Sequence, residues 1–157
     1  MRSELLATTP EANPISSFPP PPRVLSLIVA ESHLTDPRTG QNSVIGIIDH
    51  LHSARYPVQL SKLCVFAELT NGRGTVPMII RVIDADEARP PVLTGNVDVS
   101  FSDPLAVAQV VCGAVGATFP EPGEYRAQIL SGGAVLGERR LLMVLDQPPE
   151  QQTGGQP

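Results

Sequence analysis

Residues 97–101 read Val97-Asp98-Val99-Ser100-Phe101, a strict alternation of apolar and polar side chains. Successive side chains of a β-strand point to opposite faces of the sheet. The alternation therefore places Val97, Val99 and Phe101 on a buried face and leaves Asp98 and Ser100 in water. This stretch predicts a half-buried strand, and with it a fold built from sheets.

Apolar and β-branched runs recur on both sides of this segment, separated by clusters of Gly, Pro, Asn and Asp at the short spacing of a meander or Greek key. Seventeen Pro and 13 Gly among 157 residues also disfavour long helices. The runs predict strands at residues 23–31, 43–50, 62–70, 75–84, 92–101, 105–112, 123–131 and 134–145. Residues 105–117 are also compatible with a short helix, because they are rich in Ala, but their Val and Gly content favours a strand.

The connections between these runs carry the residues that turns require. Asp36–Gly40 combines a Pro with a following Gly, and Asn71–Gly74 and Ser131–Gly133 supply residues that tolerate positive φ. Each segment predicts a tight turn, and the last two predict hairpins. Pro77 cannot donate a hydrogen bond within a sheet, so it is expected at an edge or a bulge.

The stretch Phe119–Tyr125 places a Tyr just inside a strand after a Pro-Gly corner. Sandwich domains use such a Tyr to tie the corner to nearby backbone through its hydroxyl. In the strand that follows, Tyr125, Ala127 and Ile129 alternate inward. The sequence therefore predicts an immunoglobulin-like two-sheet β-sandwich of about seven or eight mostly antiparallel strands.

The two ends of the chain differ in composition from its middle. Residues 1–22 end in four consecutive prolines, residues 147–157 are polar, and together they hold nine of the 17 prolines. Neither segment has the apolar periodicity that a core needs, so both are expected to be disordered tails. One β-sandwich domain is predicted at residues 23–146.

The overall charge narrows the classes of partner. The net charge is −5, which disfavours nucleic acid, because nucleic acid is held mainly by clustered Lys and Arg. Neither a secretory signal nor a membrane-spanning run is evident, so we expect a cytoplasmic protein. Lys62 is the single Lys against ten Arg, a usage typical of a GC-rich bacterial genome.

Several segments together resemble a family of uncharacterised bacterial proteins classed only as a domain of unknown function. The matching segments are Val24–Val29, Ser43–Asp49, Tyr56-Pro57, Val65–Thr70, Gly123–Tyr125 and Leu136–Arg140. The resemblance implies a β-sandwich. It supplies no activity, no cofactor and no functional residues.

An acidic loop, Asp84-Ala85-Asp86-Glu87, follows one predicted strand. Sandwich domains gather carboxylates around Ca²⁺ in such loops, and Asp98 and Asp103 are the candidate additional ligands. Simple solvation of the loop is the more common explanation. The sequence therefore leaves a weak hypothesis of a Ca²⁺ site at Asp84, Asp86 and Glu87.

His50 and His52 stand two residues apart, so an extended strand points both imidazoles to one face. With Asp49 or Glu31 nearby they could hold Zn²⁺, but two ligands are not a site. A third imidazole would have to come from His33. A solvated strand end explains the pair more simply.

The sequence shows no sign of an active site. There is no Gly-x-Ser-x-Gly turn, and no His lies near Cys64 or Cys112 along the sequence, which leaves their proximity in the fold open. Both cysteines are expected to be reduced, buried thiols. Gly113–Gly116 and Asn71–Gly74 lack the Lys-Ser/Thr of a phosphate loop and are interpreted as turns. Arg139 and Arg140 should fall on opposite faces of a strand, so at most one reaches any anion. We therefore predict a protein that is not an enzyme and that has no cofactor.

Several strands are apolar on both faces, although a two-layer sandwich buries only one. The surplus predicts a protein partner or a homo-oligomer, with a two-fold dimer favoured and an interface on the order of 1,000 Å² or more. The tails, a short helix or a curled sheet could also cover part of it. The leading hypothesis is a non-catalytic interaction module acting through a sheet face or an edge strand, and the alternative is a ligand- or Ca²⁺-binding sandwich.

Limited proteolysis should trim both ends of the chain and leave a fragment near residues 23–146, because proteases cut segments that lack a packed core. Mass spectrometry of the surviving fragment measures its boundaries. Protection of either end against cleavage would contradict this domain assignment.

Overall fold

The computed structural model describes residues 19–148, and in this range the chain forms nine strands and no helix. The strands are β1 (Arg23–Thr35), β2 (Asn42–Ile47), β3 (His50–Ser53), β4 (Val58–Thr70), β5 (Gly74–Asp84), β6 (Leu93–Phe101), β7 (Ala108–Phe119), β8 (Gly123–Ser131) and β9 (Ala134–Leu145). The described range accordingly includes no helix with the length and apolar character needed to cross a membrane.

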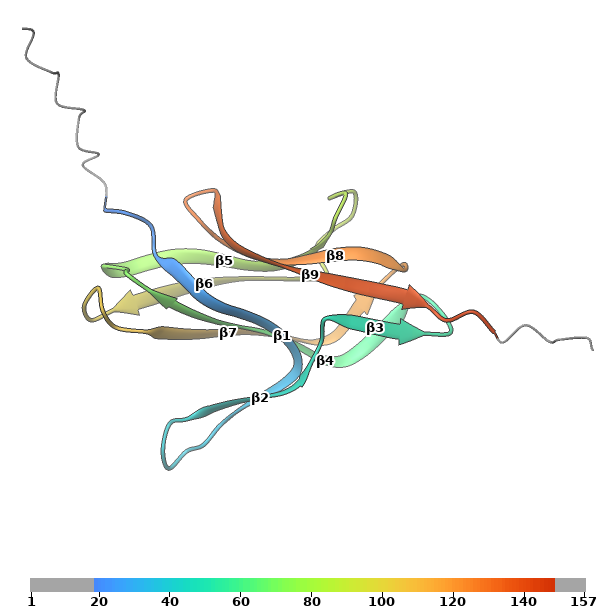
Figure 1. Cartoon of the computed structure of the whole chain (residues 1–157), viewed down its shortest axis with the longest axis horizontal. Coiled ribbons are helices and arrows are strands. Elements are labelled where there is room, and N and C mark those ends of the chain that lie inside the picture. The colour runs from blue at the N-terminus through green and yellow to red at the C-terminus, as the bar shows by residue number, and fades with distance from the viewer. Residues whose placement is uncertain (1–18, 149–157) are drawn as a thin grey trace, which may run out of the picture.

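The strands form two stacked sheets (Figure 1). Sheet A has the order β2-β1-β4-β7, and sheet B has the order β3-β9-β8-β5-β6. All neighbours are antiparallel except β3 and β9, which are parallel. The predicted immunoglobulin-like two-sheet sandwich of mostly antiparallel strands is confirmed, with one short strand more than expected.

The core lies between the inner faces of the two sheets. On β6 the predicted alternation is confirmed, because Val99 and Phe101 are buried while Asp98 and Ser100 are exposed. Burial of one such aliphatic side chain stabilises the fold by roughly 1.5–3 kcal/mol. The largest fully buried side chains are Phe119, Leu63, Leu69, Ile80, Ile129, Leu141, Met143, Val29, Val65 and Val82.

Residues 43–50, predicted as one strand, are divided between the two sheets. Strand β2 ends at Ile47 and β3 begins at His50 in the other sheet. At the crossing Ile48 enters the core, its N–H donates to the carbonyl of Val29, and the carbonyl of Asp49 accepts from Leu142. An apolar run predicts extended backbone, but it carries no information about which sheet the backbone joins.

The strand predicted at 105–112 begins later and runs further. The carboxylate of Asp103 accepts the N–H groups of Leu105 and Ala106, which holds this segment in a turn, so β7 starts at Ala108. Gly113–Gly116 therefore lies within β7. Its interpretation as a turn from the sequence is wrong.

Two turn predictions have different outcomes. Ser131–Gly133 forms the expected hairpin between β8 and β9. The segment Asn71–Gly74 has the expected positive φ at both ends, but it connects β4 of sheet A to β5 of sheet B, so the hairpin prediction is wrong. Pro77 lies in β5 before the first pair with β8, at Ile79, so its missing N–H interrupts no ladder on that side.

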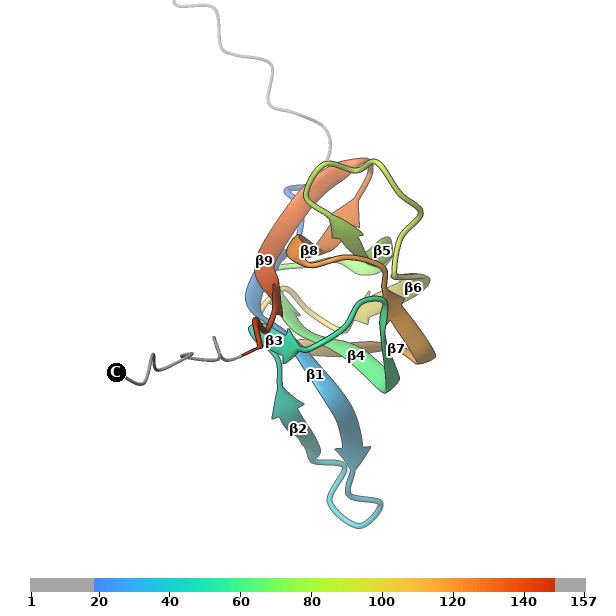
Figure 2. The same ribbon diagram turned by 90° about the vertical axis from the view of Figure 1, so that its right-hand side faces the viewer.

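The second face of β4 is covered by the chain itself. We call residues 31–47, the outer part of the β1–β2 hairpin, the arm; in both views it lies on the side of sheet A away from sheet B (Figures 1 and 2). The ring of His33 stacks on Phe66 with centroids 6.3 Å apart, and Phe66 is 6% exposed. The surplus apolar face of β4 is thus buried within one molecule, which accounts for the two-sided apolar pattern of this strand.

The described residues, 19–148, extend a few residues beyond each end of the domain predicted at 23–146. Residues 1–18 and 149–157, which hold most of the predicted disordered tails, lie outside the described residues. Pro19–Pro22 were assigned to the N-terminal tail, but they line a groove together with Arg73 and Val76, and Pro22 is buried. The packed part of the chain therefore begins before Arg23.

Tyr125 occupies the corner predicted for it. Its side chain is 2% exposed, its hydroxyl donates to the carbonyl of Glu121 at 2.8 Å, and it accepts from the Glu121 N–H at 3.3 Å. Its ring meets that of Phe119 edge to face, with centroids 5.0 Å apart. The side chain thus closes the turn between β7 and β8, which joins the two sheets.

Replacing Tyr125→Phe should lower the free energy of unfolding by about 1 kcal/mol, because the ring stays and only the hydroxyl bonds are lost. Tyr125→Ala should cost roughly 3–5 kcal/mol, the range for deleting a large buried aromatic. Urea unfolding of the two variants measures both values. Equal, near-zero effects would contradict the corner assignment.

Candidate interaction surface

The free edge of β7 is the longest sheet edge in the described structure. Each sheet ends in two outer strands, β2 and β7 in sheet A and β3 and β6 in sheet B, and the structure pairs β7 with β4 alone. Of these four, β7 has 12 residues, against six in β2, four in β3 and nine in β6. An outer strand presents a row of unpaired N–H and C=O groups, so β7 is the largest backbone surface open to another strand.

Strand β7 also lacks the features that normally protect an edge. Proteins block exposed edges with charges, prolines, bulges or very short strands. Strand β7 contains no charged residue and no Pro, and its register with β4 shows no shift, although its alternation reverses at Gly116, which has a φ of +68°. By contrast, β2 and β3 are short, and β6 carries Asp98.

Exposed aliphatic side chains lie along this edge. Val115 on β7 is 87% exposed, and Leu105, in the turn that precedes β7, is 90% exposed. Val107, also before β7, is half-exposed. Apolar side chains gathered beside an open edge are typical of a contact surface.

Two grooves flank the second half of β7, and Ala114 and Val115 belong to both. The first, of about 270 Å³, lies between the arm and the outer face of sheet A and includes Cys64 and Val111. The second, of about 480 Å³, lies between the loop Arg89–Val92 and the end of β7. A strand added at the edge would point alternate side chains to opposite faces, one toward each groove.

A chain of side-chain hydrogen bonds fixes the arm above the start of β7. Asn42 donates to Gln109 at 2.5 Å, Gln109 donates to Glu68 at 3.0 Å, and Ser26 donates to the same carboxylate at 2.9 Å. The bonds from Gln109 and Ser26 hold the pKa of Glu68 below its ordinary value. The first groove therefore has a wall tied to the sheet.

The two thiols lie on opposite faces of sheet A. Cys64 is buried beneath the arm, while Cys112 faces β6, where its sulfur lies 2.4 Å from the position that a Cβ at Gly95 would take. Both cysteines are free, and burial raises the pKa of each thiol. The prediction of two unpaired thiols is confirmed, and neither has the lowered pKa of a reactive cysteine.

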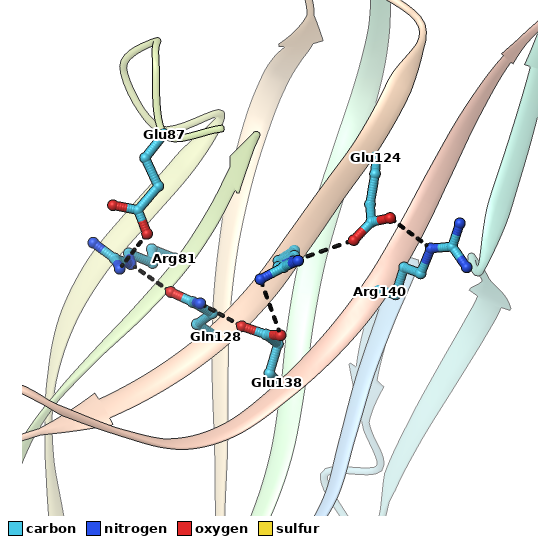
Figure 3. A network of polar contacts seen from close by, with 7 residues as sticks. Arg81, Glu87, Glu124, Gln128, Glu138 and Arg140 are labelled. Atoms are coloured by element: carbon cyan, nitrogen blue, oxygen red, sulfur yellow. Dashed lines mark hydrogen bonds and ion pairs between the residues drawn. The ribbon is translucent and has the colours of Figure 1, made fainter. Parts of the chain in front are cut away.

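A network of paired polar side chains crosses the outer face of sheet B (Figure 3), which also exposes Ile79 and Leu142. Arg81 bonds to Gln128 at 2.9 Å, and Gln128 donates to Glu138 at 2.5 Å. Glu87, Glu124, Arg126 and Arg140 continue this network. Partly exposed pairs of this kind contribute about 0–1 kcal/mol each, but a partner docking here would have to desolvate them.

Arg139 and Arg140 point to opposite faces of β9, as expected. Arg140 lies outward and pairs with Glu124 at 2.9 Å. Arg139 points inward and donates to the carbonyl of Leu27 at 3.2 Å, which joins the two sheets on the side of β1 and β9. Strands β6 and β7 lie on the opposite side of the sandwich (Figure 2).

The acidic loop does not meet its candidate additional ligands. Asp84 accepts the N–H of Ala88, and Glu87 lies 3.7 Å from Arg81. Asp98 is five residues along β6 from the end near this loop, about 17 Å at roughly 3.4 Å per residue. Asp103 lies beyond the far end of β6. The proposed grouping of these carboxylates is therefore wrong.

His50 and His52 do share one face of β3, and their ring centroids are 5.4 Å apart. Each ring bonds to its own carboxylate, His50 to Asp49 at 2.7 Å and His52 to Asp146 at 2.9 Å. His33 lies elsewhere, on the arm. Residues 19–148 contain no group of three His, Cys, Asp or Glu side chains placed to hold a metal ion.

The sequence predicted only the first part of β7 as a strand, at residues 105–112, and predicted no functional role for any of its residues. One available signal was that residues 104–120 carry no charge, in a chain in which 17% of residues are charged.

A family model described as "Family of unknown function (DUF6941)" matches residues 25–144. The chain belongs to this family. The expected resemblance to a domain of unknown function is confirmed, and the DUF6941 fold is the two-sheet sandwich described above.

Among solved structures, the DUF6941 chain is similar to an immunoglobulin-like protein from Pseudomonas aeruginosa. The two are 15% identical with a TM-score of 0.42, and the similarity covers 80% of this chain and 98% of that chain. No protein with a curated description matches the chain.

Adding Ca²⁺ or Zn²⁺ to the full chain should leave its melting temperature unchanged, because within residues 19–148 no further ligands converge on the acidic loop or the His pair. A cation present at 100 times its Kd would add about 2.7 kcal/mol of stability, which a thermal melt detects readily. A rise in melting temperature with either ion, reversed by a chelator, would restore the metal-binding hypothesis.

Proposed function

We propose that this DUF6941 chain is a non-catalytic protein-interaction module that binds through the free edge of β7. The observation that carries the proposal is a 12-residue outer strand without charge or Pro, which bears the 87%-exposed Val115. An added strand would gain backbone hydrogen bonds from the edge and side-chain contacts from the two grooves.

Three features support binding rather than catalysis. Burial raises the pKa of both thiols, which leaves them protonated and weakly nucleophilic at neutral pH. His50 and His52 lie on β3, away from both cysteines, and each bonds to its own carboxylate. His33 lines the first groove together with Cys64, but its ring is bonded to the side chain of Asn42 at 2.9 Å. The second groove beside β7 is lined mostly by aliphatic side chains and prolines, which suit contact, while the first also includes Glu31, His33 and Lys62.

The proposal includes a cytoplasmic location and a bacterial source. Free Cys64 and Cys112 favour a reducing compartment, because oxidising compartments promote disulfides. The Arg-rich, Lys-poor composition supports the bacterial source.

Val115→Lys should abolish partner binding, because it introduces a charge at the open edge beside both grooves. The side chain is exposed but lies opposite Lys62 on β4, so the like-charged pair should lower the free energy of unfolding by about 0.2–1 kcal/mol, which leaves the chain folded. Val135→Lys is the matched control, since Val135 is an exposed valine at the start of β9 in sheet B.

The measurement is quantitative capture from native cells by the tagged full chain and both variants, followed by hydrogen exchange on the recovered complex. We expect wild type and Val135→Lys to retain the same partner, with residues 108–119 protected from exchange, and Val115→Lys to lose it. Equal capture by all three proteins would overturn the assignment to β7.

A further inference from the structure

We propose that the partner at β7 is a second copy of this chain, joined by antiparallel pairing of the two β7 strands about a two-fold axis at Gly113. This inference rests on the proposed function, since it takes the β7 edge as the interface. It identifies the occupant of that edge.

Symmetry makes the absence of charge on β7 informative. In a two-fold interface the same surface meets itself, so any charge near the axis lies close to its own like-charged mate. Like charges opposite each other destabilise strand pairing. Strand β7 has no charged side chain, whereas β6 would bring Asp98 toward a second Asp98. The edge of β7 is therefore compatible with itself.

The pattern of side chains selects the register. Opposed residues in an antiparallel pair share a face, so the two-fold axis must pass through a residue and not between two. Beyond Gly116, which has a φ of +68°, the alternation reverses and Ala117 and Phe119 enter the core, so the regular part of β7 that can pair with its own copy is 108–115. The register at Gly113 sets Val111 opposite the partner's Val115, and the reverse.

This register covers the most exposed side chain of the strand. Val115 is 87% exposed in the single chain, and Val111 lines the groove beneath the arm. Each pairing brings two β-branched side chains together across the new strand boundary, a favoured cross-strand contact. Gly113 faces Gly113 at the axis, which lets the four valines flank it without crowding.

The product is one continuous eight-stranded sheet in the order β2-β1-β4-β7-β7-β4-β1-β2. The unpaired N–H and C=O groups in the paired part of both β7 strands are then satisfied, which shortens the longest open edge of the chain. An edge-to-edge contact of this length lies near the lower limit of stable interfaces, on the order of 1,000 Å² in total. The dimer should therefore dissociate on dilution.

Light scattering after size exclusion tests the pairing on the full chain over roughly a hundredfold range of concentration around the micromolar level. Wild type and Val135→Lys should reach twice the chain mass, while Val115→Lys should remain a folded monomer. A wild-type monomer throughout the range would overturn the inference.

A disulfide tests the register. Gly113→Cys should form a disulfide-linked dimer under mild oxidation, because residue 113 faces its own copy, whereas Val115→Cys should not. Both are made in a Cys64→Ala background, since a Cβ at Gly113 would lie 3.8 Å from that of Cys64, within disulfide reach in one chain. Cross-linking by Val115→Cys alone would overturn the Gly113 register.

The two proposals fail in different ways. If wild type is a monomer but Val115→Lys still loses a captured partner, the self-pairing inference is wrong and the proposed function stands. If wild type dimerises and Val115→Lys does not disrupt the dimer, the contact lies elsewhere, for instance at the exposed Leu34, Ile45 and Ile47 of the arm, and the pairing through β7 is wrong.

Discussion

The burial of both faces of β4 is the constraint from which the arrangement of the domain follows. Leu63 and Val65 face sheet B, and Cys64 and Phe66 face the opposite way, yet all four are buried. Two sheets cover only one of these faces, so the chain supplies a third layer, the arm of residues 31–47, in which His33 stacks on Phe66. Because the arm begins at β1, it covers β4 from one side, and β7 is left at the opposite edge of the sheet.

The distribution of charge distinguishes the outer face of sheet B from the free edge of sheet A. Sheet B presents an alternating array of Arg and Glu side chains whose hydrogen bonds are already made within the chain, so docking there would cost their hydration. The edge of sheet A carries no charge and offers unpaired backbone groups instead. A partner is therefore expected to bind at the edge of sheet A, because there the new backbone hydrogen bonds replace those made to the displaced water.

Local patterns in the sequence predicted what depends on local chemistry. The period of two at Val97–Phe101 predicted a half-buried strand, and the Pro-Gly corner before Tyr125 predicted a hydroxyl bond to backbone. They did not predict pairing between distant segments, because Asn71–Gly74 has the same turn residues whether it joins two strands of one sheet or two sheets. The start of β7 was missed because the carboxylate of Asp103 captures backbone N–H groups of an apolar segment that would otherwise extend. The expectation that Asp98 and Asp103 join the acidic loop was wrong for the same reason as the hairpin prediction at Asn71–Gly74. The distance of these carboxylates from the loop depends on how β6 pairs with β5, and the sequence does not contain that register.

Packing alone explains much of the composition of β7, but not all of it. Gly113 lies against β4, where an added Cβ would approach the Leu63 carbonyl at 3.5 Å, and Ala117 and Phe119 enter the core. Small or apolar residues at these positions would be required in a protein that binds nothing. Val115 differs, because it is 87% exposed and pairs across the sheet with Lys62, an exposed position where a charged side chain is accommodated. No contact within the described chain requires a valine there, and a Glu would both protect the edge and lie opposite the cationic Lys62. A valine at this exposed position is the feature that packing leaves unexplained and that contact with another strand accounts for.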